Sequence, residues 1–155
     1  MIFSSFGNAV VGFPRLAAAL EAFARSSGEE VIVQYGSTEY DFVHVKAVKF
    51  MDHEQMIDMM TRAELLVLQG GWGTISEALL MGKRIVAVPR HPPDEVNHDQ
   101  SELVRKLESL GTLIGCYDEK ELAEKIALAR TFDFKPLRRG AAWPVIDGKL
   151  REWKI

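Results

Sequence analysis

The chain has 155 residues, 47% of them hydrophobic and 26% charged, a composition that suits one small domain with a single core. Its formal net charge of −3 offers no basic field, which argues against a nucleic-acid partner or direct binding to an anionic membrane. A single cysteine, Cys116, leaves no internal disulfide and fits a reducing cytoplasm, and no apolar run is long enough to span a bilayer. We expect a cytoplasmic protein that is soluble or recruited to a membrane by a partner.

Strands and helices alternate from the first residues. Ile2–Phe6 is an apolar run that suits a strand, and Leu16, Leu20 and Phe23 recur at helical spacing. The elements expected before residue 64 are strands over residues 2–6, 31–35 and 43–50 and helices over residues 13–25 and 54–62. Ser37, in the turn after the second strand, has a hydroxyl that can hydrogen-bond a nucleotide, although such turn hydroxyls are also common without a ligand.

The stretch from Leu65 to Arg90 contains a strand, a glycine-rich turn, a helix and a second strand. The turn includes Gly71 and Gly73, whose missing side chains let a ligand approach the backbone closely. Thr74, where the helix is expected to begin, adds a hydroxyl beside the positive end of the helix dipole. This pattern is typical of a phosphate or diphosphate site, and it also fits a tight turn that binds nothing.

Glu77 lies about one turn into the same helix, roughly 5 Å along its axis, which is near the distance from a diphosphate to the ribose hydroxyls. Its carboxylate can accept hydrogen bonds from two hydroxyls, and it also complements the helix dipole. The spacing is GGxGTxxE and not GxGxxG with an acid about twenty residues later. We therefore expect no dinucleotide redox cofactor.

The rest of the chain continues the alternation after a proline- and acid-rich loop over residues 91–99. The remaining elements are a helix over residues 100–110, a strand over residues 113–116 and a helix over residues 118–130. The sequence thus predicts an α/β fold, a single doubly wound, Rossmann-like parallel sheet with helices on both faces and its ligand at the C-terminal strand ends. The histidines lack the spacing of metal ligands, so no metal site is expected.

Three segments resemble one known family. QGGWGTISEAL, GKRIVAVPR and NHDQSELVRKL follow, in order and near the right spacing, the pattern of the glycosyltransferase family 28 C-terminal domain. This domain is the donor-binding half of GT-B glycosyltransferases, and the resemblance covers about residues 1–130. It is greatest to one-domain subunits of the PssE type, which contribute to bacterial exopolysaccharides. Their eukaryotic relatives form the catalytic subunit of the UDP-GlcNAc transferase of dolichol-linked glycan assembly.

The resemblance implies further substrate-binding residues. Gly7 lies in the loop SSFGN, where relatives carry a TVGT-type loop, and Gln100 and Glu102 match a QxE pair whose side chains face the donor sugar. Arg90 would pair with a phosphate or hold its loop by a salt bridge, and the second role is favoured. The family's histidine before GGxGT is replaced here by Gln69. This departure, together with a shifted His98, leaves the catalytic group unassigned.

The function implied is that of a UDP-sugar-binding subunit, with UDP-GlcNAc as donor, in an inverting glycosyltransferase of polysaccharide or glycan-lipid biosynthesis. The acceptor-binding half, which in two-domain relatives usually supplies the base, would be a separate, membrane-associated protein. The partly apolar surface around Trp72 and the methionine-rich helix could meet that partner or, without it, a second copy of the chain.

Two alternatives remain at this point. A phosphoribohydrolase of the LOG type also carries a PGGxGTxxE turn, although Gln69 replaces its proline and the later NHDQSEL cluster has no place in that pattern. The other alternative is a binding module that has kept the nucleotide-binding fold but lost the sugar-transfer activity. Residues 1–130 are expected to form the nucleotide-sugar-binding domain, and residues 131–155 a tail that packs back on it or docks a partner.

Overall fold

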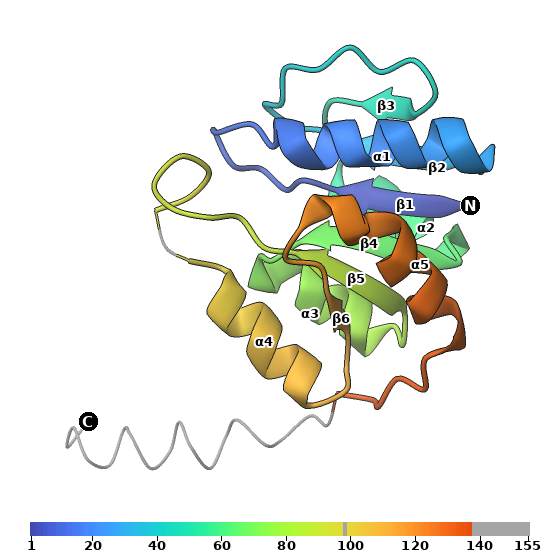
Figure 1. Cartoon of the computed structure of the whole chain (residues 1–155), viewed down its shortest axis with the longest axis vertical. Helices are drawn as coiled ribbons and strands as arrows, with labels where there is room; N and C mark the ends of the chain where they lie inside the picture. Colours follow the sequence, from blue (N-terminus) through green and yellow to red (C-terminus); the bar gives the residue numbers. More distant parts are fainter. Residues whose placement is uncertain (98, 138–155) are drawn as a thin grey trace.

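The computed structural model describes residues 1–97 and 99–137, which form one sheet covered by helices (Figure 1). In chain order the elements are β1 (Ile2–Ser5), α1 (Pro14–Ser27), β2 (Val31–Gln34), β3 (Lys46–Val48), α2 (His53–Arg62), β4 (Leu65–Gln69), α3 (Trp72–Leu80), β5 (Arg84–Val88), α4 (Ser101–Ser109), β6 (Ile114–Gly115), the short 3-10 helix η1 (Glu119–Glu121) and α5 (Leu122–Thr131).

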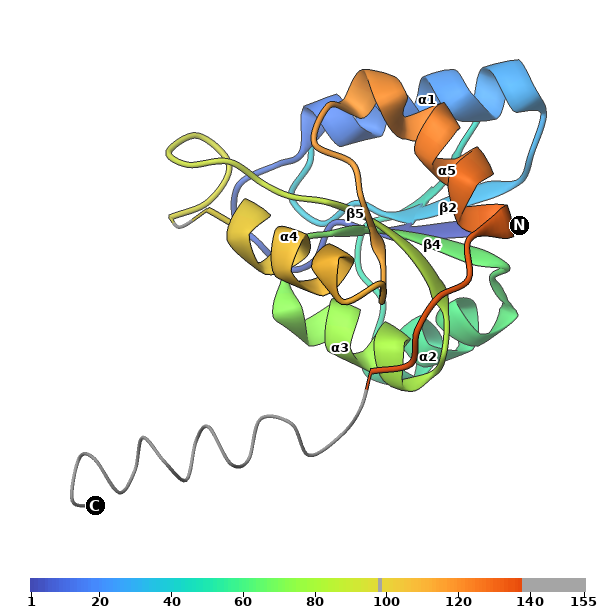
Figure 2. The same cartoon turned by 60° about the horizontal axis from the view of Figure 1, so that its bottom comes forward.

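All six strands are parallel, in the order β3-β2-β1-β4-β5-β6. Strands β2 and β3 therefore follow β1 on one side of the sheet, and β5 and β6 follow β4 on the other side. Helices α1 and α5 cover one face of the sheet, and α2, α3 and α4 cover the other (Figure 2). This confirms the predicted doubly wound α/β fold.

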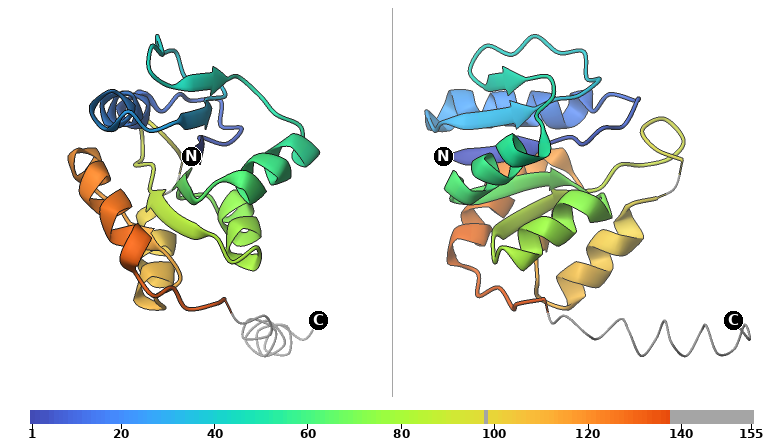
Figure 3. Two further views of the ribbon diagram at one scale, coloured as in Figure 1. Left: turned by 90° about the vertical axis from the view of Figure 1, so that its right-hand side faces the viewer. Right: turned by 180° about the vertical axis from the view of Figure 1, so that it is seen from behind.

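The strands read as nearly continuous apolar runs because both faces of the sheet are buried. In β4, Leu65 and Val67 pack on the side of α1 and α5, whereas Leu66 and Leu68 pack on the side of α2, α3 and α4. Views from the side and from behind show the two helical layers on either side of the sheet (Figure 3). The core thus consists of two apolar layers that share the sheet between them.

Element bounds differ from the sequence-based expectations at a few ends. The strand expected over residues 43–50 is only Lys46–Val48, at the exposed edge of the sheet. Helix α3 begins at Trp72, two residues before the expected start, because Gly71 already acts as its N-cap. The last expected helix is divided into η1 and α5.

The segment after α5 runs back along the domain as far as the structure describes it. Arg84 donates hydrogen bonds to the carbonyls of Ala129 (2.7 Å) and Phe132 (3.2 Å), and the rings of Phe132 and Phe134 pack edge to face. The rest of the expected tail, with Trp143 and Trp153, lies outside the described residues. Within the described ranges, no helix is both long enough and apolar enough to cross a membrane.

The burial of β4 gives a test of this architecture. Leu66 is fully buried in a strand that pairs with both β1 and β5, so Leu66→Ala should lower the free energy of unfolding by about 2–5 kcal/mol. The same substitution at Leu128, which is 47% exposed on α5, should cost less than about 1 kcal/mol. Urea unfolding of both variants makes the comparison, and equal losses would contradict the assignment of β4 to the core.

Candidate functional site

A small pocket with polar lining residues lies at the point where the strand order reverses, between the C-terminal ends of β1 and β4. In open parallel sheets this switch point is the usual place for a ligand. The pocket has a volume of about 170 Å³. Its lining residues come from the ends of β1, β2 and β4 and from the starts of α2 and α3: Ser5, Gly7, Asn8, Gln34, Met56, Gln69, Gly71, Gly73 and Thr74.

The polar side chains at the ends of β1 and β2 bond to one another. Ser5 is the register partner of Gln34, and its Oγ donates to Gln34 Oε1 at 2.7 Å. The N–H of Gly7 donates to Ser5 Oγ at 3.2 Å, while Gln34 Nε2 donates to the carbonyl of Lys49 at 3.1 Å. This part of the pocket is therefore polar but already hydrogen-bonded within the protein.

The N-terminus of α3 opens onto the same pocket. Its N-cap, Gly71, has no side chain to accept a hydrogen bond, and no acidic residue lies in its first turn. The first N–H groups of a helix have no partner within the helix and carry the positive end of its dipole. Since Gly71, Gly73 and Thr74 line the pocket, these backbone donors can meet an anion there.

Arg90 lies beneath the pocket and does not face it. Its side chain, 1% exposed, stacks on the ring of Phe13 at 4.4 Å. The guanidinium donates to Gln69 Oε1 (2.7 Å) and to the carbonyl of Phe6 (3.1 Å), as well as to the carbonyls of Val11 and Gly12. These hydrogen bonds leave Arg90 unable to contact a ligand directly. Within the described residues its role is structural, through carbonyl and carboxamide acceptors and not through the expected salt bridge.

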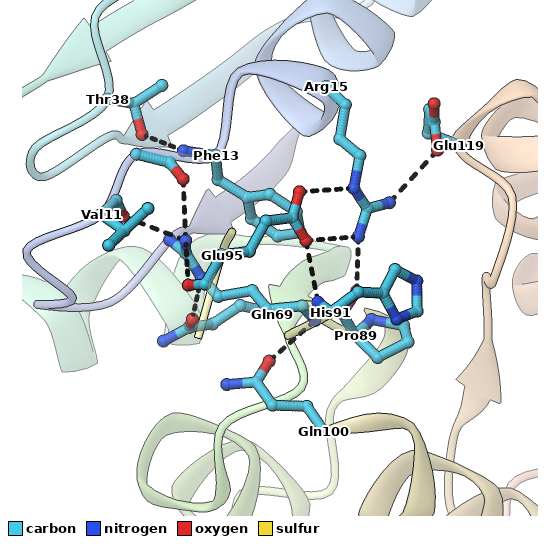
Figure 4. A network of polar contacts seen from close by, with 12 residues as sticks. Val11, Phe13, Arg15, Thr38, Gln69, Pro89, His91, Glu95, Gln100 and Glu119 are labelled. Atoms are coloured by element: carbon cyan, nitrogen blue, oxygen red, sulfur yellow. Dashed lines mark hydrogen bonds and ion pairs between the residues drawn. The ribbon is translucent and has the colours of Figure 1, made fainter. Parts of the chain in front are cut away.

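A second arginine ties the loop after β5 to helix α1 (Figure 4). Arg15 donates to both carboxylate oxygens of Glu95, at 2.7 and 3.0 Å, and to the carbonyl of Pro89 at 2.6 Å. Burial alone would raise the pKa of Glu95, but the hydrogen bonds from Arg15 and from the His91 N–H hold that pKa below its ordinary value. Glu95 is thus ionised and engaged at neutral pH, which makes it a structural anion.

The structure brings four of the sequence-predicted site residues together in the pocket lining, namely Gly7, Gly71, Gly73 and Thr74. Gln100 lies next to them and is 9% exposed, with its Oε1 accepting from the backbone N–H of Arg90 at 3.0 Å. Glu77 is one turn further along α3, where one of its carboxylate oxygens lies 3.7 Å from Nε2 of the exposed His53.

Two other predicted residues lie away from this pocket. Ser37 lines a separate hollow of about 510 Å³, together with residues of the loops after β1 and β5. Glu102 is exposed in the first turn of α4 and does not line the pocket. The displaced histidine, His98, lies outside the described residues.

Sequence reasoning missed the polar side chains Ser5, Gln34 and Gln69 as pocket residues. A usable signal was present, because each is the last residue of its strand, and in β2 and β4 it follows only apolar residues. In a parallel sheet the C-terminal ends of neighbouring strands lie side by side, so these polar residues had to meet at one edge.

Residues 1–97 and 99–137 contain no group of three or more His, Cys, Asp or Glu side chains that could hold a metal ion. Burial raises the pKa of the Cys116 thiol to about 11, so it is not a nucleophile at neutral pH.

The family model of the glycosyltransferase family 28 C-terminal domain matches residues 12–142. No curated protein matches the sequence. The matched segment includes the glycine-rich turn and Arg90, whereas the lining residues Ser5, Gly7 and Asn8 precede it.

Solved structures share this fold. The glycotransferase of kitacinnamycin superposes with a TM-score of 0.64 at 19% identity, over 99% of this chain and 38% of its own. UDP-GlcNAc 2-epimerase from Neisseria meningitidis, bound to UDP-GlcNAc, gives 0.57 at 13% identity, over 97% of this chain and 43% of its own. The solution structure of ALG13 gives 0.61 at 18% identity, over 96% of this chain and 94% of its own. The chain thus spans less than half the length of the first two proteins.

The close contact between Gly7 and Gln69 can be tested with two matched substitutions. Gly7 and Gly28 both have positive φ, 71° and 68°, so alanine at either costs roughly 1–2 kcal/mol of backbone strain. A Cβ on Gly28 meets nothing, whereas one on Gly7 would lie 1.9 Å from Gln69 Nε2 and push that side chain off Arg90. Gly7→Ala should therefore cost about 1–3 kcal/mol more stability than Gly28→Ala in thermal or urea unfolding. Equal losses would show that Gln69 is free to move.

Proposed function

Because the chain belongs to the glycosyltransferase family 28 C-terminal domain family, we propose that it binds the nucleotide-sugar donor of a glycosyltransferase in the pocket between β1 and β4. The observation that carries this proposal is the uncapped N-terminus of α3, which opens onto the pocket through Gly71, Gly73 and Thr74. The family match also favours this function over the phosphoribohydrolase alternative, because it extends through the segment after the glycine-rich turn.

The diphosphate of the donor would occupy the pocket. Backbone N–H groups of a helix N-terminus, with the hydroxyl of Thr74 beside them, form a site that attracts negative charge without a cation. The same groups would stabilise the negative charge that develops on the diphosphate when the bond to the sugar breaks. In the transfer, an acceptor oxygen forms a bond to the anomeric carbon, the bond to the diphosphate oxygen breaks, and the acceptor's proton passes to a base.

We propose UDP-GlcNAc as the donor. Glu77, one turn beyond the pocket along α3, is placed to accept hydrogen bonds from the two ribose hydroxyls, and its present neighbour His53 is exposed and can be displaced. The side chains of Gln100 and Glu102 would face the donor sugar. Support for the uridine nucleotide comes from the resemblance to UDP-GlcNAc transferases and from the shared fold of an epimerase that was solved with UDP-GlcNAc.

The acceptor is proposed to bind mainly to a separate, membrane-associated protein on the cytoplasmic side, in polysaccharide or glycan-lipid biosynthesis. Pockets that enclose a small molecule usually have volumes of about 300–1,000 Å³, and this pocket, at about 170 Å³, is one wall of such a site. Trp72 lies between two lining glycines, and its large apolar side chain is 51% exposed. We propose that the partner covers this side chain. The described residues that line the pocket include no side chain suited to act as a base, and we propose that the partner supplies it.

The ribose assignment can be tested by Glu77→Ala. Loss of charged hydrogen bonds worth about 1.5–3 kcal/mol each should weaken the binding of UDP tenfold or more in titration calorimetry. Glu124→Ala, which removes the same charge from the exposed side of α5, is the matched control and should leave the affinity unchanged. Equal UDP affinities for Glu77→Ala and the wild type would contradict the assignment.

The need for a partner can be tested by a transfer assay with UDP-GlcNAc and lipid-linked acceptors. The purified chain alone should bind the donor but show no multiple turnover, because positioning donor against acceptor contributes roughly 7–11 kcal/mol and one wall is absent. Transfer should appear when an acceptor-binding protein is added. Robust turnover by the monomer would overturn the two-subunit proposal. Asp94, His98 and Asp99 would then be the first candidates for the base, since Glu95 is held by Arg15.

A further inference from the structure

Two glutamine side chains share Arg90 as their hydrogen-bond donor. Gln69 Oε1 accepts from the guanidinium Nε–H at 2.7 Å, and Gln100 Oε1 accepts from the backbone N–H at 3.0 Å. Both groups of Arg90 can only donate, so each contact requires the oxygen of the carboxamide and not its nitrogen. Arg90 therefore determines which way both carboxamides point.

The nitrogen atoms of these carboxamides face the glycine-rich turn. A Cβ added to Gly71 would lie 3.3 Å from Gln69 Nε2 and 3.8 Å from Gln100 Nε2. Figure 4 shows both nitrogens pointing away from the hydrogen bonds of their oxygens and toward the same side. Within the described part of the chain, neither nitrogen has a hydrogen-bond partner, although Gln69 lines the pocket and Gln100 is nine-tenths buried.

Arg90 cannot turn to serve a ligand itself. Its other guanidinium nitrogens are held by the carbonyls of Phe6, Val11 and Gly12, which belong to the end of β1 and the loop that follows. A buried cation that lost these acceptors would be strongly destabilised, so the guanidinium stays where it is. Its influence on the pocket has to pass through the side chains that it holds.

We propose that Arg90 is a positioning residue that holds Gln69 with its NH₂ group toward the pocket, where this group donates a hydrogen bond to the diphosphate of the nucleotide sugar. Gln100, oriented in the same way, presents a second NH₂ group beside Gly71. This inference rests on the proposed function and adds a contact to it. The hydrogen bond from Arg90 polarises the carboxamide and makes its N–H a stronger donor.

The hydrogen-bond donor at position 69 therefore carries no proton that titrates at physiological pH. A carboxamide keeps its N–H groups at every physiological pH, whereas an imidazole at the same position would gain or lose a proton near pH 6.5. Among the described residues, the charged or titratable groups nearby include Arg90, the pair Arg15 and Glu95 on α1 and the loop after β5, and the pair His53 and Glu77 on α2 and α3. They are unchanged by substitution at position 69, so a difference between variants reports on that position alone.

The test is titration calorimetry of UDP-GlcNAc with the wild type and with Gln69→Glu, Gln69→His and Gln55→Glu. In Gln69→Glu the carboxylate keeps the contact with Arg90 but loses the donor and repels the diphosphate, so affinity should fall at least about tenfold. Gln69→His should add a pH dependence to whatever the wild type shows, with affinity rising further as pH falls from about 8 to 6. Gln55→Glu makes the same charge change in the capping box of α2, where Glu is equally suitable, and should leave affinity unchanged.

The positioning role of Arg90 needs a double-mutant cycle. Arg90→Lys should weaken binding when Gln69 is present and should have little further effect in the Gln69→Met background, because the arginine acts through that carboxamide. An equal effect of Arg90→Lys in both backgrounds would overturn the positioning role. If Arg90→Lys does not fold, the Gln69 variants still decide whether the carboxamide contacts the donor.

The outcomes separate the two proposals. Binding by the wild type that Gln69→Glu leaves unchanged, or a Gln69→His variant without added pH dependence, would overturn this inference and leave the proposed function standing. Absence of UDP-GlcNAc binding by the folded wild type would overturn both.

Discussion

The burial of one cation organises the edge of the sheet at which the pocket lies. Removing a charged guanidinium from water is costly unless its N–H groups find acceptors, and Arg90 finds them on several segments at once. The acceptors are the carbonyls at the end of β1 and in the loop after it, together with Gln69 at the end of β4. The backbone N–H of the same residue holds Gln100 before α4. These segments lie far apart in the chain, and the hydrogen bonds to Arg90 fix their positions relative to one another.

Among the residues that the structure describes, the pocket lining includes no charged side chain. The lining consists of glycines, hydroxyls, carboxamides and one methionine, and its positive character comes from the N-terminus of α3. Such a site suits an anion that has to leave after reaction, since a fixed dipole and neutral donors hold a diphosphate less tightly than a paired arginine would. Arg15 and Glu95 form an ion pair that holds the loop after β5 against α1, and neither residue belongs to the pocket lining.

Much of the fold followed from local patterns. The alternation of apolar strands with helices predicted the doubly wound parallel sheet, and the glycines before Thr74 predicted the turn into α3, because both depend on residues close together in the chain. The same patterns placed Gly71, Gly73 and Thr74 in one pocket. They were less informative at the edge of the sheet, where β3 is short and exposed and few packing contacts define its ends.

The sequence by itself therefore determined the order of elements, the parallel sheet, the family and the helix N-terminus at which an anion can bind. Only the tertiary structure decided which polar residues belong to the pocket and which support it. Arg90 reads in the sequence as a phosphate ligand or a structural cation, and the choice depends on acceptors such as the carbonyl of Phe6, 84 residues away. Ser37 and Gln69 look alike as polar residues near strand ends, yet they line different hollows. Contacts of this kind are set by the three-dimensional path of the chain, which no local pattern of residues encodes.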